Sequence, residues 1–557
     1  MSIFRNGLLV LSGVAFVAAV GCSSPEVPAD IVFLGGNVWS GIPGDPPAEA
    51  LAVTAGFVQA VGTNREIRAL SGRGTEVVRL RGRMVVPGFI DSHTHFISGG
   101  FQLSSVDLRD ADSRDEFGAR IVGFLEGKQP GEWVVGGDWD HEMWGGELPQ
   151  KEWIDAGTLL NPVFVSRLDG HMALANSVAL ELAGITASTP VPPGGEIVLD
   201  PATGEPTGVL KDEAMGLVTR VMPESTDDEL DQALDDAIEY ALSMGVTQTH
   251  HVGTWGHLET FQRARADGRL KMRVYSVVPI STWERLRDFV EENGTGDDYL
   301  WWGGLKGFVD GSLGSTTAWF YDAYADDPST SGLLTTDTAS LRRWALAGDE
   351  AGLQLFIHAI GDQANDWLLD VYESAVEQNG PRDRRFRIEH AQHLSPEAVA
   401  RFSSLGVIPA MQPYHAIDDG RWAEKRIGPE RIKTTYAFRS LLDAGATLSF
   451  GSDWTVAPMD VRQGLFAALT RRTTDGGNPD GWVPEEKISL EEALTAYTWG
   501  SAYAGFAEGS VGRLEAGKYA DLVVLSQDLF EMDPVEIPTV QVEITMVGGN
   551  IVYRNEG

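Results

Sequence analysis

The chain has 557 residues, enough for two to four domains at roughly 100–200 residues per domain. Its 43 Lys and Arg against 80 Asp and Glu give a formal net charge of −37, which repels phosphate backbones and excludes nucleic-acid binding. An apolar fraction of 43% excludes a disordered chain. The single cysteine, Cys22, excludes an intramolecular disulfide, so any metal must be held mainly by His and carboxylates.

The first 22 residues have the pattern of an export signal. Arg5 precedes an apolar run over residues 8–20 that is too short to span a bilayer. The end of this run, at Cys22, resembles a bacterial lipoprotein signal, in which the cysteine is lipidated after cleavage; Ala19 stands where leucine is usual. We expect a lipoprotein-type signal peptide over 1–22, a tether over 23–29, and export to the bacterial cell envelope with Cys22 as the membrane anchor. The alternative is an ordinary cleaved signal with an incidental cysteine.

Both ends of the remaining chain have the pattern of small sheets. Short apolar runs at residues 31–34, 51–53 and 57–61 are separated by Gly, Asn and Pro. The same pattern returns at 512–525 and 540–552. We therefore predict that residues 30–86 and 510–557 pair into one composite small β domain.

Residues 87–509 alternate short apolar runs with helical patterns such as 227–243 and 338–351. This alternation predicts parallel strands at 89–95, 246–252, 272–279, 304–310, 353–358, 386–391, 406–412 and 447–453. Eight such strands predict an α/β fold, a TIM-like (β/α)8 barrel. The long gap after the first strand predicts an inserted subdomain over about 100–225. A doubly wound sheet is the alternative architecture.

Five residues of the kinds that bind metals stand at the ends of predicted barrel strands. His93 and His95 end the first strand two residues apart, so their side chains point to one side. His358, His390 and Asp453 end the fifth, sixth and eighth strands. Strand ends converge where barrel enzymes keep their active sites, so these residues predict a metal site. The alternative is a structural histidine cluster bonded to backbone carbonyls.

Lys306 lies in an apolar stretch on the fourth predicted strand. Burial lowers the pKa of a lysine, and a neutral amine can capture carbon dioxide as a carbamate that bridges two metal ions. The alternative is an ammonium paired with a carboxylate such as Asp310.

Five segments in order resemble the motifs of the metal-dependent amidohydrolase superfamily: His93-Thr94-His95, Lys306 with residues 310–318, then 358–362, 388–392 and 451–454. The closer resemblance is to the amidohydrolase-3 branch, which includes N-substituted formamide deformylases. It implies a small β-sandwich built from both chain ends beside the barrel. It also implies that the metal is held by His93, His95, His358, His390 and Asp453, with Lys306 as the carbamate. Thr316 departs from the arginine of many relatives.

Other groups are candidates to shape the pocket. Residues 138–140 and 167–171 resemble stretches of the same branch, and His171 is a candidate to contact a substrate carbonyl; the alternative is a histidine bonded within the inserted subdomain. Trp139, Trp319 and Trp454 adjoin the motifs and would suit an apolar or aromatic substrate, unless they serve ordinary packing.

Together these observations predict a hydrolase of amide or related non-peptide C–N bonds in small molecules, acting through a metal-activated water. One or two divalent ions are expected, with zinc favoured by imidazole and carboxylate ligands. Asp453 would move the proton, with His171 as a further catalytic candidate. Two alternatives remain: the same site acting on cyclic amides, esters or by deamination, and a solute-binding lipoprotein that uses the barrel rim for recognition alone.

Overall fold

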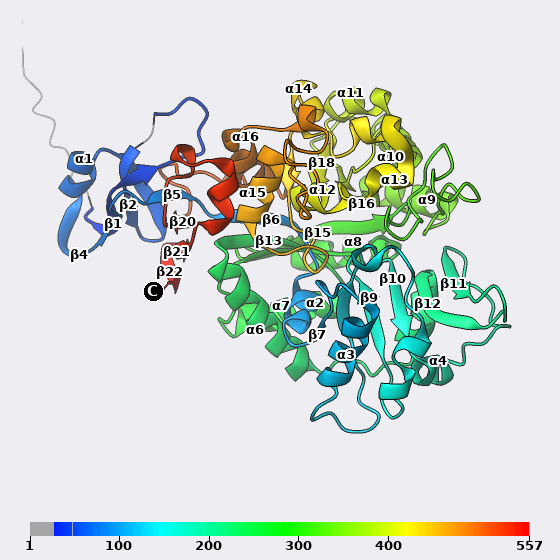
Figure 1. The fold of residues 1–557 in the computed structure, drawn as a ribbon. Coiled ribbons are helices and arrows are strands. Elements are labelled where there is room, and N and C mark those ends of the chain that lie inside the picture. The colour runs from blue at the N-terminus through cyan, green and yellow to red at the C-terminus, as the bar shows by residue number, and fades with distance from the viewer. Residues whose placement is uncertain (1–26, 47, 556–557) are drawn as a thin grey trace, which may run out of the picture.

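The computed structural model describes residues 27–46 and 48–555. Its centre is a barrel of eight parallel strands, which confirms the predicted α/β barrel architecture (Figure 1). The strands pair in chain order: β6 (Phe89–Thr94), β13 (Val246–Val252), β14 (Arg273–Pro279), β15 (Leu300–Phe308), β16 (Gln354–Ala359), β17 (Arg387–His390), β18 (Ile408–Met411) and β19 (Ser449–Phe450). A parallel bridge between Thr94 and Trp454 joins the two ends of the sheet, so the barrel is nearly closed.

Helices surround these strands because each presents one apolar face. In α6 (Asp227–Ser243), Leu234, Ile238 and Leu242 recur at helical spacing and are buried, and a capping box of Thr226 and Glu229 starts the helix. The other main barrel helices are α7 (Trp255–Ala266), α8 (Trp283–Asn293), α9 (Thr338–Glu350), α10 (Asp362–Asn379), α11 (Pro396–Leu405), α14 (Phe438–Asp443), α15 (Val461–Thr470) and α16 (Leu490–Thr495). Helices α12 (Pro413–Asp419) and α13 (Ala423–Arg431) follow β18.

A second sheet joins the two ends of the described chain, and its blue and red strands lie side by side in Figure 1. Strand β20 pairs antiparallel with β5, with Val85 opposite Val524. Buried Phe33, Val85 and Met546 share one apolar cluster. The sheet comprises β1 (Ala29–Val38), β2 (Ala48–Thr54), β3 (Phe57–Gly62), β4 (Ser71–Arg79), β5 (Met84–Pro87), β20 (Leu522–Leu525), β21 (Val542–Val547) and β22 (Asn550–Arg554).

The segment between β6 and β13 forms a third sheet with its own apolar cluster around Phe117 and Trp139. Its strands are β7 (Val106–Asp107), β8 (Gly136–Trp139), β9 (Phe164–Arg167), β10 (Met172–Ala175), β11 (Gly195–Leu199) and β12 (Pro206–Asp212), with α3 (Arg114–Phe124) and α4 (Ser177–Ala183). In Figure 1 this cyan unit packs against one side of the barrel.

The expected signal peptide, Cys22 and most of the expected tether lie outside the described residues, and β1 begins at Ala29. Within residues 27–46 and 48–555, none of the helices has both the length and the apolar character needed to cross a bilayer.

Candidate active site

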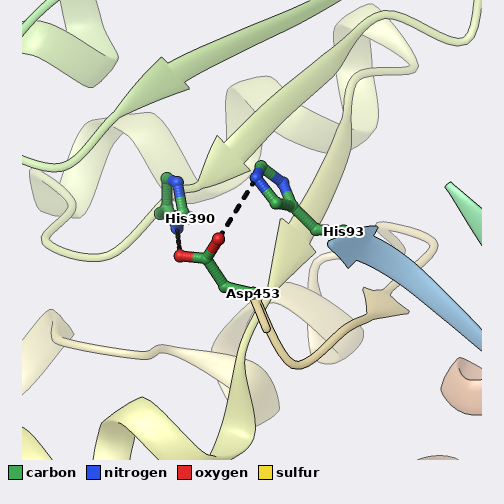
Figure 2. Close-up of side chains that lie close together, drawn as sticks. All are labelled: His93, His390 and Asp453. Atoms are coloured by element: carbon green, nitrogen blue, oxygen red, sulfur yellow. Dashed lines mark ion pairs between the residues drawn. The ribbon is translucent and has the colours of Figure 1, made fainter. Parts of the chain in front are cut away.

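Three predicted ligands meet at the carboxyl end of the barrel (Figure 2). His93 projects from β6, His390 ends β17, and Asp453 follows β19. One ligand atom from each lies within 4.8 Å of the other two. His93 Nε2 is 3.5 Å from Asp453 Oδ1, and His390 Nδ1 is 3.9 Å from Asp453 Oδ2. The three buried side chains form a candidate metal-binding site.

The other three predicted ligands reach the same place. His95 Nε2 lies 3.4 Å from Asp453 Oδ1, and Lys306 Nζ lies 3.3 Å from His93 Nε2. The ring of His358 is 4.5 Å from that of His390, measured between centroids. All six residues therefore gather at one end of the barrel, as their positions on the predicted strands suggest.

The chemistry of this donor set fits a divalent cation. Asp453 Oδ1 is buried and accepts no hydrogen bond among the described residues, although the Nε2 atoms of His93 and His95 both face it. The pKa values of His93 and His390 lie well below the ordinary value, chiefly because both rings are buried and also because Lys306 and other histidines lie nearby. Neutral imidazoles and an ionised carboxylate are the ligand forms that a metal requires.

Hydrogen bonds fix the tautomers of the candidate ligands. His93 Nδ1 donates to Glu389, and His390 Nδ1 donates to Gln412 Oε1 at 2.9 Å. His358 donates through Nε2 to the Gly311 carbonyl at 3.0 Å. In each histidine the bonded nitrogen carries the proton, so the other nitrogen keeps its lone pair for a ligand; in His93 that atom, Nε2, faces Lys306 Nζ at 3.3 Å. Such outer partners orient metal ligands and raise their basicity.

The backbone is strained at two of these positions. His390 has φ 73° and Asp453 has φ 59°, a region that residues other than glycine rarely adopt. Strand β19 covers only Ser449–Phe450, whereas the sequence predicts a strand over 447–453; beyond it, the Asp453 amide donates to the His93 carbonyl at 2.8 Å, which holds this segment against β6. Strain of this kind persists where surrounding structure holds a side chain in a functional position.

Lys306 does not form the alternative pair with Asp310. The Asp310 carboxylate instead accepts three backbone N–H groups, from Trp319, Ile360 and Gly361, at 2.7–3.0 Å. Burial lowers the pKa of Lys306 to about 8. About a tenth of this amine is therefore neutral at pH 7, far more than for an ordinary lysine, and the neutral form is the one that reacts with carbon dioxide.

A family model described as the amidohydrolase family (Amidohydro_3) matches residues 76–553. The chain belongs to the amidohydrolase family. It is 41% identical over 540 residues to Protein LONG AFTER FAR-RED 3 of Arabidopsis thaliana, covering 95% of this chain and 92% of that one. It is also 30% identical over 548 residues to the N-substituted formamide deformylase of Arthrobacter pascens, covering 95% and 99%.

The fold comparison agrees. The crystal structure of an uncharacterized metal-dependent hydrolase from Pyrococcus horikoshii matches with a TM-score of 0.72 and 30% identity, covering 91% of this chain and 99% of that one. The resemblance stated from the sequence motifs is therefore confirmed.

In this amidohydrolase the candidate ligands open onto a pocket of about 70 Å³. His95, Lys306, His358, His390 and Asp453 form its floor, since they cluster at the strand ends. Side chains of the inserted segment and of the segment after β18 also line it: Arg167, Asp169, His171, His415, Asp418, Asp419 and Trp422.

His171 reaches this pocket from the inserted segment. Its Nδ1 lies 2.6 Å from Asp212 Oδ1, and its ring is 5.1 Å from that of His358. Burial lowers the pKa of His171, but the hydrogen bond to Asp212 and nearby carboxylates outweigh it, so the pKa lies above the ordinary value. With Nδ1 engaged, Nε2 remains for a substrate.

Residues 167–169 line the pocket, and Asp140 supports Arg167 from behind. Arg167 Nη1 donates to Asp169 at 2.7 Å, and Arg167 Nη2 donates to Asp140 at 3.0 Å. Gly314 permits this close approach, because a Cβ there would lie 2.2 Å from Arg167 Nη1. Arg421 Nη2 also donates to Asp140, at 2.8 Å, and so ties the inserted segment to the segment after β18.

The remaining candidates have structural contacts. Trp139 is fully buried and donates to the Val165 carbonyl, and Trp454 packs in the barrel core, so neither shapes the pocket. Two histidines of β13 that lie near the site also have structural contacts: His250 Nδ1 accepts from Arg387, and His251 Nδ1 accepts from the Phe96 amide.

Sequence reasoning missed several pocket groups. Asp212, Gln412 and Asp419 carry no ligand motif of their own, and only the folded chain places them beside His171, His390 and Gln392. The pairing of Arg387 with Glu389 could have been predicted, because the two residues are two apart on β17 and so lie on the same face of the strand.

Proposed function

We propose that this chain is a metal-dependent hydrolase of amide or related non-peptide C–N bonds in small molecules. The observation that carries the proposal is the convergence of His93, His390 and Asp453, with a buried Asp453 oxygen that lacks a hydrogen-bond partner within the described residues. The relative from Arthrobacter pascens, named for its action on N-substituted formamides, supports the choice of bond.

In this proposal the metal is held by His93, His95, Lys306, His358, His390 and Asp453. Lys306 would act as a carbamate, which its buried and partly neutral amine favours. Nitrogen and oxygen ligands without thiolates favour zinc among divalent ions, in one or two copies. Such an ion supplies Lewis acidity toward a carbonyl and lowers the pKa of water toward neutrality.

In this proposal Asp453 transfers the proton, and His171 binds the carbonyl oxygen of the substrate. Asp453 Oδ1 would take a proton from the attacking water and pass it to the nitrogen of the departing amine. His171 Nε2, held by the Asp212 bond on the other ring nitrogen, would donate to the substrate carbonyl oxygen. The small pocket favours a compact acyl group such as formyl over a bulky one.

Metal content and hydrolysis test the proposal together. We expect about one or two divalent ions per purified chain, with activity lost on chelation and restored by zinc. The substrates should be a panel of N-formyl and N-acyl amines beside cyclic amides, esters and aminopurines. A metal-free protein indifferent to chelators would contradict the metal assignment. Turnover confined to the other substrates would contradict the bond assignment.

We also propose that the chain is exported and held at the bacterial cell envelope by lipid on Cys22. The support is the short apolar run that ends at the only cysteine. Acyl chains contribute about 0.8 kcal/mol per buried CH₂, so two or more would hold the protein at a membrane. Cys22→Ser should release it into the soluble fraction. Wild-type protein already free in that fraction would contradict the anchor.

A further inference from the structure

The pocket wall formed after β18 holds a carboxylate, Asp419, that forms no ion pair with another described residue. Asp419 ends α12, and its Oδ2 accepts hydrogen bonds from Gln392 Nε2 at 2.7 Å and Tyr436 Oη at 2.6 Å. Both donors are neutral and both use the same oxygen. No ion pair to Asp419 forms within residues 27–46 and 48–555. The neighbouring pocket carboxylates differ, because Asp169 pairs with Arg167 and Asp418 pairs with Arg421.

Gln392 presents a second acceptor at this wall. Its Nε2 faces both Asp419 Oδ2 and His393 Nε2, at 2.7 and 3.1 Å. Because a carboxylate only accepts hydrogen bonds, the amide nitrogen must lie on that side, which leaves Gln392 Oε1 on the other. Both Gln392 and Asp419 line the pocket. The wall thus holds two acceptor oxygens, Asp419 Oδ1 and Gln392 Oε1.

An independent observation indicates that this wall is built for a polar ligand. Trp422 is 7% exposed and lines the same pocket, yet its Nε1 has no hydrogen-bond partner among the described residues. His415 Nε2 is likewise buried without a partner there, while its ring lies parallel to that of His390. Buried polar groups are normally satisfied, so these atoms require an explanation, which a polar ligand supplies.

We propose that the substrate carries an N–H-rich cationic group, such as a primary ammonium or guanidinium, remote from the bond that is cleaved, and that Asp419 and Gln392 bind it. The cation neutralises Asp419, and its N–H groups reach both acceptor oxygens. Burial raises the pKa of Asp419 to about 7, although Tyr436, Arg167 and Arg421 act to lower it. This inference rests on the proposed hydrolase function.

Two isosteric substrates test the inference. N-formylcadaverine ends in an ammonium, and N-formylhexylamine places a methyl group there. We expect wild-type kcat/KM to favour N-formylcadaverine by about 10–100-fold, the worth of a hydrogen bond to a charged group. Asp419→Asn keeps the shape and an acceptor for Tyr436 but removes the charge. It should abolish most of the preference, chiefly through KM, with unchanged metal content.

A matched control and a binding measurement separate the possible results. Glu424→Gln removes one charge from an exposed position just beyond Trp422 and should keep the preference. Calorimetry measures the affinity of both compounds for the slow variant Asp453→Asn, with and without Asp419→Asn. The contribution of Asp419 to binding is then measured separately from turnover. Hydrolysis of both compounds at equal kcat/KM would overturn the inference and leave the proposed function standing. Absence of hydrolysis with selective, Asp419-dependent binding would overturn the function and leave the cation site standing; absence of both would overturn both.

Discussion

A buried chain of charges behind His93 gives the sharpest test of how the fold prepares the site. Arg387 donates to both oxygens of Glu389, at 2.8 and 3.1 Å, and His93 Nδ1 donates to Glu389 Oε2. Arg387 and Glu389 are both fully buried. Glu389→Gln keeps the size of the side chain but replaces one acceptor oxygen by an NH₂ donor. In either orientation that donor faces Arg387, His93 or both.

Two effects of this substitution have different sizes. Removing one partner of a buried ion pair costs about 3–5 kcal/mol of stability. At His93, an amide NH₂ opposite Nδ1 would move the ring proton to Nε2, the atom that faces Asp453. Loss of an outer partner of this kind lowers metal affinity by about 10–100-fold, equivalent to about 1.4–2.7 kcal/mol. Stability should therefore change more than metal binding.

Urea unfolding of metal-free protein and competition with a chelator measure the two effects separately. The matched control is Glu373→Gln, which removes a carboxylate from an exposed pair with Arg401 at 3.1 Å and should cost at most about 1 kcal/mol. If Glu389→Gln binds zinc as tightly as wild type and unfolds at the same urea concentration as Glu373→Gln, the buried chain does not organise the site.

Three further substitutions probe the catalytic groups. Asp453→Asn should keep near-normal metal content but lower turnover by about 10²–10⁴-fold, and unchanged turnover in the metal-replete variant would assign the proton transfer elsewhere. Lys306→Ala should lose one of two ions and most activity by elemental analysis and kinetics; full activity, or a crystal structure with an unmodified ammonium in wild type, would exclude the carbamate. His171→Gln should lower kcat by about 10²-fold with KM and metal content unchanged, and a loss confined to KM would make His171 a binding group instead.

The barrel was predictable because its signal is local. Core strands that are buried on both faces tend to have continuous apolar runs, as Leu355, Phe356 and Ile357 do in the fully buried β16. Strand ends were less predictable. Strand β15 begins at Leu300, before the predicted 304, because Leu300, Trp301 and Trp302 pair with β14. Strand β19 is shorter than the predicted 447–453, and the residues after it contact β6 through single bonds, from the Asp453 amide to His93 and from the His95 amide to Trp454.

The metal-site candidates were predictable for a related reason. Their positions at strand ends are set by barrel geometry, so spacing along the chain carries information about place. No comparable rule of barrel geometry sets the positions of the residues in the pocket wall. Asp212 and Asp419 come from the inserted segment and from α12, and their roles depend on contacts with His171, Gln392 and Tyr436 that no periodicity encodes. Trp139 shows the converse, since it adjoins a motif and yet is fully buried, in the ordinary packing role that the sequence also allows.

This division of labour has a consequence for specificity. The candidate metal ligands stand on or directly after barrel strands, which are rigid and pair in a fixed register. The wall that would read the substrate comes from two other segments, joined by Arg167 and Arg421 through the buried Asp140. Sequence changes in those segments alter the pocket without moving a strand end. Relatives that keep the same metal-ligand motifs can therefore differ in substrate, and the charge at Asp419 is the feature of this chain by which its own substrate should be sought.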